Sequence, residues 1–239
     1  MVRISRRPGR DRDLGQPRRH RGRWAVAAVL ALAVLAVGAV LLGVALQSSP
    51  APLALPAGAA APVGQVDGVW RAGAGSVAGF RVRETILGVG NDITGRTGAV
   101  SGTATVSSGR LESAAFQVSL RSIGVGGGAR QREFLQTLGA AAHPDAVVAL
   151  SAPVPLPPAF TVGAAITVTA RASFTLNGMT RPVTVTLTAR RDGGAIEAAG
   201  SLPVAFSAFG IQSPGGWGFL GSLADHGIAE FLVVLRPSS

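Results

Sequence analysis

The chain has 239 residues, 47% of them hydrophobic, and a formal net charge of +10 from 22 basic and 12 acidic side chains. It contains no cysteine, which excludes disulfide bonds and thiolate metal sites. Nine of its arginines lie within residues 1–23, so the positive charge is concentrated in one tail rather than spread over a nucleic-acid-binding surface, and we predict no nucleic-acid partner.

An apolar segment follows this basic tail. Residues 24–46 contain no charged side chain and would form a helix about 35 Å long, enough to cross a hydrocarbon core of about 30 Å. A cleaved signal peptide is the alternative, but its apolar region usually has only about 7–15 residues. Since arginines flank the cytoplasmic side of membrane helices, we expect a cytoplasmic tail over residues 1–23, a single transmembrane helix over residues 24–46 and an extracytoplasmic remainder.

Residues 47–66 contain four prolines, six alanines, two glycines and no charge. Such a composition cannot bury a core, so we expect an extended or disordered linker. The folded domain is then expected to occupy residues 67–239.

This domain has the pattern of short strands separated by turn signals. An Asn177-Gly178 pair between two alternating segments is the clearest of these signals and predicts a two-residue hairpin. A helix is expected at 129–138, because Phe134, Leu135 and Leu138 would share one face, and an irregular loop at 209–224. Strands are expected at 69–72, 76–84, 96–106, 111–120, 147–152, 166–176, 183–187, 196–206 and 227–235.

Short strands joined by hairpins, with one short helix, indicate an all-β fold, either an antiparallel barrel or a sandwich. Many of the inward positions carry Ala, Val or Gly, which would leave space inside an eight-stranded barrel. A compact sandwich in which these small residues pack tightly is the alternative.

Several segments resemble the YceI-like family, lipocalin-like barrels outside the cytoplasm that bind lipids and polyisoprenoids, and in particular its membrane-anchored actinobacterial members. The similarity spans about Val69 to Leu235. It departs from the family at Leu138 to Ala142, which lacks the usual acidic and aromatic residues, and this affects the shape of the cavity opening. The segments that carry the resemblance are Trp70, Ser76 to Val82, Arg130 to Phe134 with His143-Pro144, Leu176 to Val183, Phe209-Gly210-Ile211 and Asp225-His226-Gly227.

The resemblance implies an apolar barrel cavity that holds a polyisoprenoid, quinone or similar lipid. Arg130 and Arg132 on the predicted helix, together with His226, are candidates for contacting a polar head group. The side chains expected to line the cavity are Phe80, Val82, Phe116, Val118, Phe134, Phe174, Leu176, Phe206, Phe209, Trp217 and Phe219.

Motifs of common catalytic sites are missing from the sequence, including G-x-S-x-G, the P-loop and H-E-x-x-H. We therefore predict a binding protein with no catalytic residue, metal or cofactor. One alternative is an enzyme acting on isoprenoid lipids through Asp225, His226 or Glu133, although Asp225 and His226 as neighbours on a strand would point to opposite faces. A second alternative is a packed barrel without a cavity that binds envelope proteins through its outer surface.

Overall fold

The structure is a computed structural model, and it describes residues 32, 34–39, 43, 49–212 and 221–238. The chain divides into two compact units, residues 1–44 and residues 45–239. The described residues of the first unit are helical and exposed. The predicted basic tail and most of the predicted membrane helix lie outside the described residues, and among those described no helix has both the length and the apolar character needed to span a bilayer.

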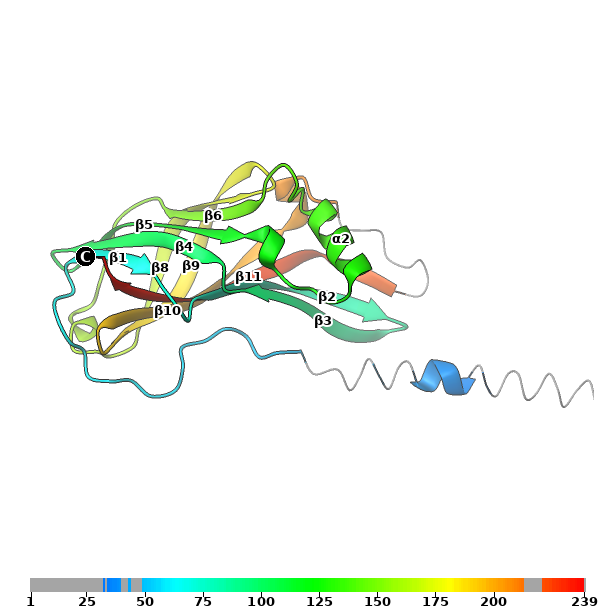
Figure 1. The fold of residues 1–239 in the computed structure, drawn as a ribbon, viewed down its shortest axis with the longest axis horizontal. Coiled ribbons are helices and arrows are strands. Elements are labelled where there is room, and N and C mark those ends of the chain that lie inside the picture. The colour runs from blue at the N-terminus through cyan, green and yellow to red at the C-terminus, as the bar shows by residue number, and fades with distance from the viewer. Residues whose placement is uncertain (1–31, 33, 40–42, 44–48, 213–220, 239) are drawn as a thin grey trace, which may run out of the picture. The chain divides into compact units, whose positions relative to one another are not determined.

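The second unit is a β structure with one α-helix in its described part, α2 (Gly128–Thr137) (Figure 1). Three short 3₁₀ turns accompany it: η1 (Leu120–Ser122), η2 (Pro158–Phe160) and η3 (Phe206–Phe209). The strands are β1 (Gly68–Ala72), β2 (Val77–Ile86), β3 (Val89–Thr97), β4 (Val100–Ser107), β5 (Arg110–Ser119), β6 (Asp145–Leu150), β7 (Val154–Pro155), β8 (Ile166–Leu176), β9 (Met179–Asp192), β10 (Ala195–Ala205) and β11 (Gly221–Pro237).

The main sheet closes into an antiparallel barrel. Eight strands follow one another around it in the order β1-β4-β5-β6-β8-β9-β10-β11, and β11 pairs back to β1 with Trp70 opposite Pro237. β2 and β3 pair with each other, and β2 also pairs with the first part of β11, so this hairpin lengthens the wall at the end where α2 lies (Figure 1). The eight-stranded barrel is confirmed, and the sandwich alternative is wrong.

The predicted Asn177-Gly178 hairpin is confirmed. Asn177 has φ 50° and Gly178 has φ 71°, as a type I′ turn requires, and Leu176 pairs with Met179 across it. The His143 ring lies against Gly178, where an added β-carbon would come within 2.6 Å of it. The glycine is therefore required both by its backbone conformation and by this close contact.

Several elements differ from the expectation. The strand expected at 96–106 is interrupted between β3 and β4, and β9 is longer than the expected 183–187. β3 was not predicted before Arg96, because its first half contains Gly90, Asn91 and Asp92, which are rare in strands. β11 begins at Gly221 rather than Gly227, with an irregularity in its pairing between Leu223 and Gly227. In the first half of β3 and the first part of β11, pairing with β2 outweighs local propensity.

Residues 49–66, here named the strap, lie in the segment that we expected to be an extended or disordered linker. The strap is extended but lies against the barrel. Towards its end, the Ala60 amide donates to Asp192 Oδ1 (2.6 Å) and the Val63 amide donates to the Gly193 carbonyl (2.8 Å). At its start, the Ser49 hydroxyl donates to the carbonyl of Asp92 in β3 (2.8 Å). The strap therefore runs back along the barrel, from the end near the β2–β3 hairpin to the end near β1 (Figure 1).

Arg191 fixes the strap at the β1 end. Its side chain donates to the carbonyls of Val63 (2.8 Å), Gly64 (2.7 Å) and Thr161 (3.0 Å), and the residue is only 4% exposed. Trp70, 2% exposed, donates its indole N–H to the Val66 carbonyl (2.8 Å). Arg191 Nη2 and the Trp70 indole N–H would lose these partners if the strap left, so the barrel and the strap form one folded unit.

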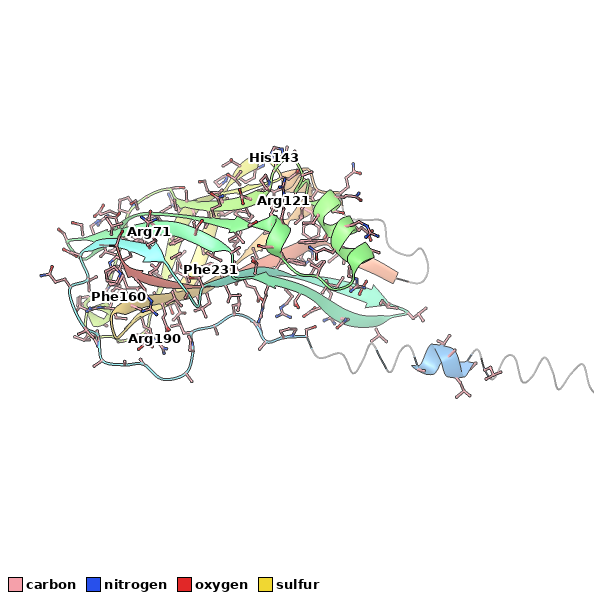
Figure 2. The ribbon with its side chains drawn as sticks, viewed as in Figure 1. Arg71, Arg121, His143, Phe160, Arg190 and Phe231 are labelled. Carbon is pink, nitrogen blue, oxygen red and sulfur yellow. The ribbon has the colours of Figure 1, made fainter. Side chains whose placement is uncertain are left out.

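The buried core consists of two clusters along the barrel. One surrounds Trp70 and Phe160, and the other surrounds Phe174 and Phe209. In Figure 2, Phe160 lies at one end of the barrel and His143 at the other.

Candidate ligand cavity

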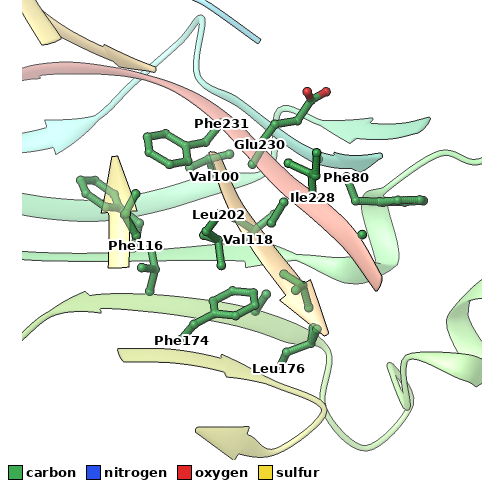
Figure 3. A pocket seen from close by; sticks show the side chains of 18 of the residues that line it. Phe80, Val100, Phe116, Val118, Phe174, Leu176, Leu202, Ile228, Glu230 and Phe231 are labelled. Carbon is green, nitrogen blue, oxygen red and sulfur yellow. The ribbon is translucent and has the colours of Figure 1, made fainter. Parts of the chain in front are cut away.

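A cavity of about 650 Å³ lies inside the barrel, a size within the usual range of about 300–1,000 Å³ for small-molecule sites. It extends from Phe160 at the β1 end to Phe134 of α2 and Leu138, directly after α2, at the other end. Most of its lining is apolar, as Figure 3 shows for Val100, Phe116 and Leu202. The alternative of a packed barrel without a cavity is therefore wrong.

Small side chains keep this space open. Strand alternation directs Ala170, Ala172, Phe174 and Leu176 of β8 to the interior, and the first two are too small to fill it. Alanines on other strands also line the cavity, namely Ala78, Ala104, Ala114, Ala146, Ala189, Ala198 and Ala229. The prediction that small inward residues leave an interior space is confirmed.

The cavity opens at the α2 end, here named the mouth. Three of its lining residues at this end, Arg130, Glu133 and Ser222, are exposed. At the opposite end Phe160, Ile196 and Leu235 are all buried. A ligand would therefore enter from the side of α2 and the β2–β3 hairpin.

Helix α2 partly covers the mouth. Its Phe134 ring stacks on Phe80 of β2, with ring centroids 4.8 Å apart and planes inclined by 16°. Gln131 fixes the start of the helix to the preceding loop, donating to the Ile123 carbonyl (2.8 Å) and accepting from the Val125 amide (3.0 Å). The side-chain amide of Gln131 and the stacked rings of Phe134 and Phe80 thus hold the loop and the helix over the opening.

The structure places eight of the eleven predicted cavity residues in the lining: Phe80, Val82, Phe116, Val118, Phe134, Phe174, Leu176 and Phe206. Phe209 does not line the cavity. It is buried in η3 and packs edge-on against Phe174, with centroids 5.4 Å apart. Trp217 and Phe219 lie outside the described residues.

The three predicted head-group residues are separated. Arg130 lines the cavity at the mouth, whereas Arg132 is exposed on α2 and does not line it. His226 is exposed on β11 and does not line it either.

His226 instead pairs with its neighbour Asp225, with Nδ1 2.7 Å from Oδ1, contrary to our expectation that the two side chains would point to opposite faces. The pairing irregularity between Leu223 and Gly227 breaks the alternation of side chains there. The hydrogen bond from His226, and then its charge, lower the pKa of the Asp225 carboxyl below its usual value.

The residues proposed for the enzyme alternative do not share a pocket. Glu133 lines the cavity, whereas Asp225 and His226 do not. Within the described part of the chain, no group of three or more His, Asp or Glu side chains could hold a metal ion. The geometry therefore offers a lined apolar chamber rather than an assembled acid–base site.

Sequence reasoning missed two acidic residues in the cavity wall. Glu230 is buried, but its carboxylate turns away from the interior (Figure 3) and pairs with Arg96 at 2.8 Å. Glu84 is buried on β2 and lines the cavity. It could have been found from the alternation that already placed Phe80 and Val82 inside, since Glu84 is the next residue on that face.

Comparison with known proteins agrees with this architecture. A polyisoprenoid-binding domain from Saccharophagus degradans implicated in plant cell wall breakdown matches with a TM-score of 0.55 and 16% identity, over 71% of this chain and 98% of that one. BcnA of Burkholderia cenocepacia matches with a TM-score of 0.51 and 20% identity, over 66% of this chain and 95% of that one. At these identities the likeness concerns the fold.

A search among curated proteins found no match. The family model of the YceI-like domain matches residues 71–229, which covers nearly the whole barrel from β1 into β11. The chain therefore belongs to the YceI-like family.

Proposed function

We propose that this protein is a membrane-tethered, extracytoplasmic binding protein that holds a polyisoprenoid, quinone or similar lipid in its barrel. The observation that carries the proposal is the continuous apolar cavity, about 650 Å³ in volume and open at one end. The Saccharophagus degradans domain, described as polyisoprenoid-binding, supports the same ligand class.

The lining suits a long hydrocarbon chain. Each methylene buried in it contributes about 0.8 kcal/mol, so a tail of several isoprenoid units would bind firmly without a hydrogen bond. Phe116, Phe174 and Phe231 give the walls large aromatic surfaces for branched methyl groups to pack against.

The tether is proposed from the sequence and supported by the strap. The apolar residues 24–46 behind a basic tail are those of a membrane anchor with its N-terminus in the cytoplasm, as in the membrane-anchored actinobacterial type. The strap brings Ser49 to β3 at the mouth end of the barrel. A chain anchored through residues 24–46 would thus join the barrel at the end through which lipid enters.

Native mass spectrometry of the full chain, purified in mild detergent from bacterial membranes, tests the binding. We expect a co-purifying lipid of defined mass. Ala172→Trp, which fills the cavity, should abolish this adduct, whereas Thr169→Trp, at an exposed position of the same strand, should retain it. A chain that stays free of lipid after incubation with polyprenols and quinones would contradict the proposal.

A further inference from the structure

The carboxyl group of Glu84 is placed unusually for the wall of an apolar chamber. Ala78, Phe80, Val82 and Glu84 share the inward face of β2, and Glu84 is only 7% exposed. It is therefore a buried acid that points to the same interior as the phenyl ring of Phe80.

The arginines of β2 do not neutralise Glu84. Arg81 and Arg83 alternate with it on the outer face, where both pair with Asp92, at 3.3 and 3.2 Å. Within residues 49–212 and 221–238, the Glu84 side chain has neither an ion pair nor a hydrogen bond. Glu230 differs, since its carboxylate is paired with Arg96 on the outside.

The position of Glu84 along the cavity is set by its place on β2. Glu84 is opposite Leu223 of β11 and Asn91 of β3, two residues before the end of β2, which puts it near the mouth. Arg130 and Glu133 of α2 are exposed at the rim. A lipid whose tail fills the barrel towards Phe160 would bring its head to this level.

The Glu84 carboxyl lines the cavity without a protein partner, so a ligand donor that reaches it gains a hydrogen bond to a charged group. From this geometry we infer that Glu84 is the head-group site of the cavity, and that it selects lipids whose head donates a hydrogen bond, such as an alcohol, over lipids with a phosphate head. A hydroxyl can donate to the carboxylate, whereas a phosphate would place a second negative charge beside it. The inference rests on the proposed function and specifies its ligand class.

Three probes with one tail test it: farnesol, farnesyl methyl ether, in which a methyl group replaces the donor hydrogen, and farnesyl phosphate. Each is loaded at equal concentration into the same detergent solution of the full chain, and occupancy is measured by native mass spectrometry. We expect the wild-type chain to bind farnesol about ten- to a hundredfold more tightly than the ether, as the loss of a hydrogen bond to a charged group implies, and the phosphate more weakly than farnesol.

Glu84→Leu should bind farnesol and the ether equally, and Glu112→Leu, an exposed acid on β5, should keep the wild-type preference. Equal wild-type affinity for farnesol and the ether, or tighter binding of the phosphate, would overturn the inference while leaving lipid binding intact. Binding of none of the three probes would instead remove the proposed function, and this inference with it. The comparison of probes on the wild-type chain decides the matter even if Glu84→Leu does not fold.

Discussion

The Phe134 ring of α2 stacks on Phe80 of β2 with centroids 4.8 Å apart, and this contact ties the helix to the wall at the mouth of the cavity. Such a ring pair contributes about 0.5–1.5 kcal/mol beyond the area it buries. Phe134→Ala should therefore accelerate ligand release by about two- to tenfold. Release into competing lipid can be followed by native mass spectrometry. Gln136→Ala, an exposed position on the same helix, serves as the control, and an equal release rate in all three proteins would contradict the role of the ring pair.

Gly178 should tolerate no side chain. An alanine there would adopt φ 71°, at a cost of about 1–2 kcal/mol, and its β-carbon would meet the His143 ring. Gly109→Ala is a matched control, because Gly109 has φ 72° with open space around it. We expect Gly178→Ala to lower the free energy of unfolding more than Gly109→Ala does, as measured by urea denaturation. Equal losses would mean that His143 moves away without cost.

Arg191 should hold the strap. Arg191→Met removes the donor of three carbonyls and should destabilise the folded state by about 1–3 kcal/mol. Amide hydrogen exchange should rise around Val63 while the strand amides of β8 and β9 stay protected. Arg236→Met, at an exposed position, should leave the exchange near Val63 unchanged. Unaltered exchange at Val63 in Arg191→Met would show that other contacts suffice.

His226 sets the ionisation of Asp225. Because the hydrogen bond and charge of His226 lower this pKa in the folded state, ionised Asp225 favours folding above the pKa of the unfolded chain, and this contribution is lost as the pH falls through the folded-state pKa. His226→Ala should raise the pKa of Asp225 towards its ordinary value. Carbon NMR of the carboxyl group during a pH titration measures the shift. Both side chains are exposed, so the melting temperature near neutral pH should hardly change.

The proposed topology can be tested because the chain has no cysteine of its own. A thiol introduced as Ser113→Cys, at an exposed site on β5, should react with a membrane-impermeant maleimide in intact cells. A thiol in the basic tail, Ser5→Cys, should react only after lysis. The reverse pattern would place the barrel in the cytoplasm and contradict the extracytoplasmic proposal.

Local pattern predicted the barrel well where turn chemistry and alternation agree. The Asn177-Gly178 hairpin and the inward face of β8 are examples, because both depend only on neighbouring residues. β3 could not be predicted, because Gly90 to Asp92 gain their strand conformation from pairing with β2.

In the candidate site, too, residues set by local alternation could be predicted, whereas those set by long-range contacts could not. Phe80 and Val82 were found from the alternation of side chains along β2. Phe209 is a large aromatic residue of the kind expected in a cavity wall, but it packs outside the cavity against Phe174. Glu84 was missed because charged residues are normally assigned to the surface. The strap could not be predicted either, since its bonds go to Asp92, Arg191 and Asp192, which are far along the chain.

The doubled-back course of the strap changes what the proline-rich segment can do mechanically. A segment that lies along the barrel adds no reach, so if residues 24–46 anchor the chain as proposed, the length of the connection to the barrel depends on the few residues that precede Ser49. Between the bonded portions, residues 54–59 make no hydrogen bond to the described part of the barrel. Extra residues inserted there would bulge outward and leave the position of the mouth unchanged. The same insertion before Ser49 would lengthen the connection between the barrel and the proposed anchor.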